Sequence, residues 1–189
     1  MTTAVCDDND IPVWLSLQCH PLYQHSGSVT VCAAVSHAAG SLLLHYRVAG
    51  EVSSLNVPGR KLPERADNLW QHTCAELFAG VEHAEAYCEF NFAPSLQWAA
   101  YQFAGYRKDL RTLSCSAPVI EMKHEDQVLE WRVELVLPWS CRQAPLQLGL
   151  SMVVEDMAGS CSYWALRHDT SRPDFHRREN WICRIESFA

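Results

Sequence analysis

Apolar and polar residues alternate with a period of two along much of the chain, which is the pattern of strands with one buried face. The clearest stretch runs from Val128 to Leu137. One face of it would carry Leu129, Trp131, Val133, Leu135 and Leu137, and the other Glu130, Arg132 and Glu134. Pro138 follows, and proline cannot donate to a strand ladder, so the strand is predicted to end there.

Shorter stretches repeat the pattern between turn signals such as Ala49-Gly50 and Pro58-Gly59. They span residues 13–19, 29–35, 41–48, 52–57, 73–78, 86–92, 99–103, 147–154 and 181–185. Helical periodicity does not persist in any segment. Roughly ten short strands with turns between them predict an all-β fold, an antiparallel two-sheet β-sandwich of the jelly-roll type with little helix.

The length of 189 residues fits a single domain over 1–189. We expect residues 1–12 to form a flexible N-terminal segment. The acidic residues Asp7, Asp8 and Asp10 do not fit a secretion signal, and no apolar run approaches the roughly 18 residues of a membrane helix. The sequence therefore predicts a cytoplasmic protein with no membrane partner.

Charge and cysteine usage exclude further classes of protein. Fifteen basic against 22 acidic residues leave a net charge of −7, which disfavours a nucleic-acid partner. The nine cysteines are widely spaced and form no Cys-x-x-Cys motif, so zinc-ribbon and thioredoxin-like sites are not predicted. We interpret the cysteines as reduced and mostly buried thiols rather than a disulfide framework.

The segment near the end of the chain concentrates aromatic and hydrogen-bonding residues. It contains Tyr163, Trp164, His168, Asp174 and His176 within fourteen residues. An aromatic ring covers the apolar C–H surface of a sugar, while polar side chains bind its hydroxyls. No nucleophile–base pair or phosphate-binding loop accompanies these residues. The segment therefore indicates a binding site for a sugar-like ligand before it indicates an active site.

Two earlier segments add candidates of the same kind. Trp70 lies where a loop meets a predicted strand, and Glu76 lies on that strand. In the next strand, alternation places Glu89 and Asn91 on the face opposite Cys88, Phe90 and Phe92, which we assign to the core. The polar face is either solvated or lines a groove. Arg107 follows and could hold a carboxylate.

Other chemistry remains open at these residues. His168, Asp174 and His176 could ligate a transition metal, but their spacing matches no established motif, and a hydrogen-bonded structural pair is the commoner arrangement. Glu76 and Glu89 could act as the carboxylate pair of a glycosidase. The sequence gives no distance between them, and carboxylates occur on most exposed strand faces. Hence no metal site and no catalytic residue are predicted.

Taken in order, these motifs resemble the DOMON-like β-sandwich family, in particular its bacterial branch related to family 9 carbohydrate-binding modules. The resemblance covers nearly the whole chain. It depends on Trp70 with Glu76-Leu77-Phe78, the segment 87–92, and Tyr106-Arg107. It also depends on Leu137-Pro138-Trp139, Tyr163-Trp164-Ala165-Leu166 and Pro173-Asp174-Phe175-His176.

The resemblance implies a non-catalytic role, in which two tryptophans clamp a terminal sugar. Trp70 and Trp164 would form the clamp, with Trp181 as the alternative second ring, and Glu76, Asn91 and Arg107 would be polar contacts. Some DOMON relatives bind haem through Met and His, but none of the four methionines pairs obviously with a histidine. We expect no cofactor, neither haem nor calcium.

The prediction is a protein that binds a saccharide-like small molecule without turning it over. Two alternatives stay open: a protein-interaction module or homodimer that uses the same exposed aromatics, and a saccharide-acting enzyme.

Overall fold

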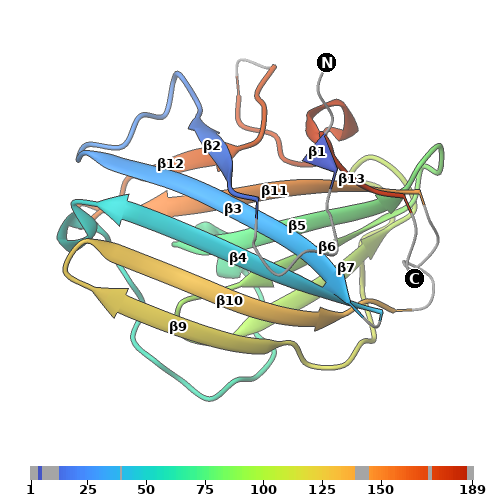
Figure 1. Ribbon diagram of the computed structural model, residues 1–189, viewed down its shortest axis with the longest axis horizontal. Helices are drawn as coiled ribbons and strands as arrows, with labels where there is room; N and C mark the ends of the chain where they lie inside the picture. Colours follow the sequence, from blue (N-terminus) through green and yellow to red (C-terminus); the bar gives the residue numbers. More distant parts are fainter. Residues whose placement is uncertain (1–3, 6–12, 39, 139–144, 170–171, 187–189) are drawn as a thin grey trace.

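The computed structural model describes residues 4–5, 13–38, 40–138, 145–169 and 172–186 (Figure 1). The strands are β1 (Ala4–Val5), β2 (Leu15–Cys19), β3 (Val29–Ala38), β4 (Ser41–Gly50), β5 (Cys74–Val81), β6 (Tyr87–Phe92), β7 (Trp98–Phe103), β8 (Arg111–Thr112), β9 (Val119–Glu125), β10 (Val128–Val136), β11 (Leu146–Glu155), β12 (Cys161–Ala165) and β13 (Cys183–Ile185). Short 3₁₀ turns are η1 (Val52–Ser54), η2 (Leu69–Gln71) and η4 (Arg178–Asn180). No helix in these ranges is long and apolar enough to cross a membrane.

Eleven strands follow one hydrogen-bonded path in the order β8-β7-β6-β5-β11-β12-β2-β3-β4-β10-β9. Every neighbouring pair on this path is antiparallel. Strand β13 pairs with β11 and, in parallel, with β1. The all-β prediction with little helix is confirmed, whereas the two-sheet sandwich is not, because pairing of β12 with β2 joins both halves into one curled sheet (Figure 1).

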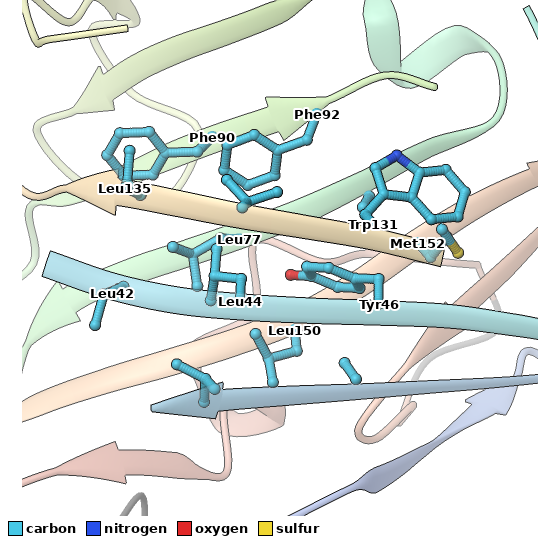
Figure 2. Close-up of a cluster of buried hydrophobic side chains, with 14 of the residues drawn as sticks. Leu42, Leu44, Tyr46, Leu77, Phe90, Phe92, Trp131, Leu135, Leu150 and Met152 are labelled. Atoms are coloured by element: carbon cyan, nitrogen blue, oxygen red, sulfur yellow. The ribbon is translucent and has the colours of Figure 1, made fainter. Parts of the chain in front are cut away.

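The main core lies between the two halves of the curled sheet. Leu44 and Tyr46 from β4 and Trp131 from β10 meet Leu77 and Phe90 from β5 and β6 in one buried cluster (Figure 2). The Tyr46 hydroxyl crosses this core and donates a hydrogen bond of 2.7 Å to the backbone oxygen of Glu76. The buried face predicted for 128–137 is confirmed, since all five of its apolar residues belong to this cluster.

Strands β5, β6 and β7 also bury side chains on the face that points away from the main core. Strand alternation brings Phe78, Tyr87, Tyr101 and Phe103 to this outer face, where they form a second apolar cluster with Trp181. Seven of the eight residues of β5 are buried, and only Val81, the last, is half-buried. A sheet buried on both faces needs a cover, and the segment 172–181 supplies part of it.

The segment 52–57 differs from the prediction of a strand. Val52–Ser54 form η1, and Leu55 makes only an isolated bridge to Asp156. Val52 and Leu55 are both buried, and their spacing of three residues is that of a 3₁₀ turn, so they reach the core without extended backbone. Strands β9 and β12 were not predicted. Strand β10 ends at Val136, two residues before Pro138, where the sequence predicted its end.

Two further expectations concern the N-terminus and the cysteines. Most of the segment 1–12 lies outside the described residues, and Ala4 and Val5 pair with Cys183 and Arg184. Cys88 is disulfide-bonded, in contrast to the predicted free thiol. Among the described residues, Cys19, Cys32, Cys74, Cys115 and Cys161 are free thiols.

Candidate functional site

A cavity of about 840 Å³ opens on the outer face of β5, β6 and β7. Its floor is built from side chains two residues apart on each strand, which strand geometry places on one face. Cross-strand register then aligns them: Glu76 lies opposite Asn91, and Phe78 lies opposite Glu89. Glu89 in turn lies opposite Tyr101. Two carboxylates therefore sit among aromatic rings on a rigid part of the sheet.

Trp70 stands on one wall of this cavity, in turn η2. Its side chain is 47% exposed, an unusual state for so large a ring. Asn68, just before the turn, has a left-handed backbone with φ of 61°, a conformation that asparagine tolerates better than most residues. The Tyr101 hydroxyl donates a 2.7 Å hydrogen bond to Asp67 and ties this loop to β7. The loop that carries the exposed ring is thus attached to the sheet.

The opposite wall comes from the segment 172–181, which lies directly on the sheet. Trp181 packs where Gly149 has no side chain: a Cβ at that position would lie 2.3 Å from the indole Cδ1. The indole Nε1 donates a 2.8 Å hydrogen bond to the backbone oxygen of Phe175, whose ring lines the cavity. Arg178 donates to the backbone oxygen of Val81 at 2.8 Å. The wall is therefore fixed to β11 and β5.

Glu76 and Glu89 are 3% and 5% exposed, respectively, and both line the cavity. Burial raises the pKa of both carboxyls, and for Glu76 the charge of Glu89 raises it further, while Arg107 partly opposes the shift. Asn91 donates a 2.7 Å hydrogen bond to Glu89 and favours its charged form. Glu76 has no such donor among the described residues. The two groups therefore titrate as a coupled pair.

Arg107 reaches the cavity from the loop that follows β7. Its Nη2 donates to Asp174 at 2.9 Å, and the Tyr106 hydroxyl donates to the other oxygen of Asp174 at 2.5 Å. Burial alone would raise the pKa of Asp174, but these hydrogen bonds lower it below its ordinary value. Arg107 has φ of 53°, a left-handed backbone that costs a non-glycine residue energy. The Arg107–Asp174 pair joins this loop to the opposite wall.

His176 lies between the cavity and the aromatic cluster beneath it. Its Nδ1 shares a 2.7 Å hydrogen bond with the Tyr87 hydroxyl, and its Nε2 is 3.8 Å from Glu89. Burial, together with the nearby Arg107, lowers the pKa of His176 to about 4. The imidazole is consequently neutral near pH 7 and does not balance the charge of Glu89.

Six of the ten residues predicted from the sequence line this cavity: Trp70, Glu76, Glu89, Arg107, Tyr163 and His176. Asn91 and Asp174 contact it indirectly, through Glu89 and Arg107. Trp164 points the other way: it is 8% exposed, packs in the main core and donates to Ser162. Because neighbouring strand residues face opposite sides, Tyr163 and Trp164 cannot both line the cavity.

Neither expected partner of Trp70 in a clamp lines the cavity, since Trp181 is buried in the second cluster. His168 is also displaced from the group: its Nε2 bonds the backbone oxygen of Gln18 at 2.9 Å, and its ring contacts His20. His168 thus has partners of its own, whereas Asp174 accepts a 3.2 Å hydrogen bond from the backbone nitrogen of His176. Across the described ranges, no three His, Cys, Asp or Glu side chains are placed to hold a metal ion.

Several lining residues were not predicted as site residues. They are Tyr23, Asp67, Asn68, Phe78, Tyr101, Phe103, Leu110, Thr112, Arg172, Pro173 and Phe175. Phe78 shares strand parity with Glu76, so alternation could have identified it. Tyr23 could not be found in this way, because it comes from a loop, where it contacts the ring of Tyr163 at 5.4 Å between centroids.

Comparison with known proteins gives similarity at the level of structure. No family model and no curated protein matches the sequence. A Bacteroides uniformis ATCC 8492 protein proposed to bind carbohydrate superposes with a TM-score of 0.66 and 15% identity, over 93% of this chain and 87% of that one. A family 9 carbohydrate-binding module from Caldicellulosiruptor kristjanssonii in complex with cellotriose superposes with a TM-score of 0.60 and 9% identity, over 100% of this chain and 91% of that one.

The same kind of module from that organism in complex with glucose has a TM-score of 0.55 and 10% identity, over 100% of this chain and 94% of that one. At such identities the likeness concerns the fold. The fold of this chain is therefore that of family 9 carbohydrate-binding modules.

Proposed function

We propose that the protein binds a saccharide in the cavity of about 840 Å³ and does not turn it over. The observation that carries the proposal is the convergence of an exposed ring, Trp70, with the polar groups Glu76, Glu89 and Arg107 around one cavity. An indole covers one face of a sugar ring, and the polar groups bind hydroxyls. The likeness to solved carbohydrate-binding modules supports this proposal. A relationship to DOMON-like proteins and a cytoplasmic location stay predictions.

Replacing Trp70 by alanine is expected to weaken saccharide binding at least about tenfold, because a central aromatic contact is lost. Isothermal titration with glucose and cellotriose measures the affinity, expected between about micromolar and millimolar for an exposed polar ligand. Trp14→Ala is the matched control: this tryptophan packs under Arg47, 4.7 Å from its guanidinium carbon, and does not line the cavity. Equal affinities of both variants and the unaltered protein would contradict the proposal.

A second candidate is hydrolysis of a glycoside, because Glu76 and Glu89 line one cavity and their environments differ. A raised pKa would keep one carboxyl protonated as a general acid, and the carboxylate accepting from Asn91 would act as the nucleophile or base. We expect no turnover of cello-oligosaccharides during prolonged incubation followed by chromatography. Product formation that disappears in both Glu76→Gln and Glu89→Gln would replace the binding proposal with this one.

A further inference from the structure

The two carboxylates on the cavity floor form no direct ion pair with a lysine or arginine of the described residues, although burial raises the pKa of both and the charge of Arg107 partly offsets this effect. Within the described part of the chain, neither Glu76 nor Glu89 forms an ion pair with a lysine or arginine; the one ionisable contact is His176, 3.8 Å from Glu89. That imidazole is neutral near pH 7, because burial lowers its pKa to about 4. Buried charge without compensation is costly, so a protein normally pairs it or removes it.

Two arginines, Arg107 and Arg172, also line the cavity. Arg107 donates to Asp174 at 2.9 Å, and its side chain is 52% exposed. Arg172 is exposed at the rim. Lysine and further arginines gather around a neighbouring cavity of about 770 Å³, lined by Lys108, Arg177 and Arg178. The basic side chains of this region therefore form no direct ion pair with the carboxylates on the floor of the main cavity, within the described part of the chain.

Aromatic rings surround these carboxylates. Trp70, Tyr101, Tyr163 and Phe175 line the same cavity as Glu76 and Glu89. A ring face attracts a cation through its quadrupole, and cavities of aromatic rings are how proteins commonly hold ammonium groups. The Glu76 side chain is buried, borders the cavity, and forms no hydrogen bond or ion pair with the residues that the structure describes. The rings and the carboxylates favour the same kind of ligand group, a positively charged nitrogen.

We propose that the saccharide bound here is an amino sugar, whose protonated amine lies between Glu76 and Glu89. The proposal rests on the saccharide-binding function inferred above and specifies its ligand class. An ammonium group has three donors and one positive charge, so it can satisfy both carboxylates at once, whereas a hydroxyl donates a single hydrogen bond. A metal ion is a poorer occupant, because the described residues offer no third ligand of the His, Cys, Asp or Glu type.

The test compares glucose with its 2-amino, 3-amino and 6-amino deoxy derivatives and with N-acetylglucosamine, by isothermal titration at pH 7. Amines of this kind are largely protonated there, since an α-amino group titrates near about 7.7–8.0. At least one amino sugar is expected to bind about tenfold or more tightly than glucose, as a charge-assisted hydrogen bond would provide. N-acetylglucosamine, which is neutral, should not share the preference.

The same titrations on Glu76→Gln and Glu89→Gln assign the preference to the two carboxylates. The readout is the ratio of the glucose and amino-sugar dissociation constants, which is expected to fall toward one in both variants. Glu134→Gln is the matched control. Glu134 is exposed on β10, so this substitution removes the same charge at a position away from the cavity. The ratio should be unchanged in that variant.

Each outcome decides one of the two proposals. Glucose binding without any preference for an amine overturns the amino-sugar proposal and leaves the saccharide proposal standing. A preference that persists in both glutamine variants also overturns it, because another group must then hold the amine. If no sugar in the panel binds, the saccharide proposal itself fails, and the amino-sugar proposal fails with it.

Discussion

Trp181→Ala should lower the free energy of unfolding by about 3–5 kcal/mol and abolish saccharide binding in the molecules that stay folded. The indole stacks on Phe78 with 5.7 Å between ring centroids and meets Tyr87 edge-on at 5.3 Å. It also holds the backbone of Phe175 by a 2.8 Å hydrogen bond. Its loss removes the anchor of the wall that carries Phe175 and His176, so stability and binding should fall together.

Trp131→Ala separates the two effects. Trp131 is fully buried in the main core, on the other side of β5 and β6, and its removal should cost a similar amount of stability. Chemical denaturation measures both free energies, and calorimetric titration under folding conditions measures binding. We expect binding per folded molecule to survive in Trp131→Ala and to be lost in Trp181→Ala. Equal binding in the two variants would show that the wall does not depend on Trp181.

Glu76→Gln should stabilise the protein at pH 8, by on the order of 1–3 kcal/mol, because it removes a buried charge that would be repelled by Glu89 and has no hydrogen-bond donor among the described residues. Burial and the charge of Glu89 raise the pKa of Glu76 in the folded protein. Above the unfolded pKa of about 4.3, the folded state then binds more protons than the unfolded state. Wild-type stability therefore falls as pH rises from that value through the raised folded pKa, whereas glutamine carries no charge to desolvate.

The pH dependence is what distinguishes this effect from a simple change in packing. The titratable and charged groups that interact with Glu76 are Glu89, Arg107, the Tyr46 and Tyr163 hydroxyls, and the Cys74 thiol. The pKa of that thiol is raised well above its ordinary value, mainly by burial. Urea denaturation at pH 4 and at pH 8 should show a small difference between variant and wild type at the lower pH and a large one at the higher. Glu134→Gln, on an exposed position, should show little difference at either pH. A gain independent of pH would contradict the explanation.

The strands could be predicted where one face is buried and the other is exposed to solvent, as in β10. Strand β12 was not predicted, because Tyr163, Trp164 and Ala165 form an unbroken apolar run in which no alternation is visible, although half-buried and buried positions alternate from Cys161 to Trp164 in the structure. Strand β9 was not predicted for a different reason: it is an edge strand and carries mostly exposed polar side chains. In both strands the types of residue do not reveal which positions are buried, so the period of two is not visible in the sequence.

The candidate site shows a similar division. Parity within a strand is visible in the sequence and separates Tyr163 from Trp164, although the residues were first taken together. Register between strands is not visible, so nothing in the sequence places Glu76 and Glu89 in one cavity. The contribution of Gly149, which lets Trp181 lie on β11, also depends on contacts between distant parts of the chain.

The two carboxylates stand on hydrogen-bonded strands, whereas Trp70 stands on a turn and Arg107 on a loop. Variation at the loops can therefore alter which part of a ligand is touched while leaving the floor and the sheet intact, since loops tolerate change better than strands do. A library randomised at 67–70 and 106–110 would explore ligand shape at constant floor charge. A library randomised at 76 and 89 would instead explore ligand charge while the loops stay constant. Because the loops and the floor are separate elements, preference for ligand shape and preference for ligand charge can evolve separately.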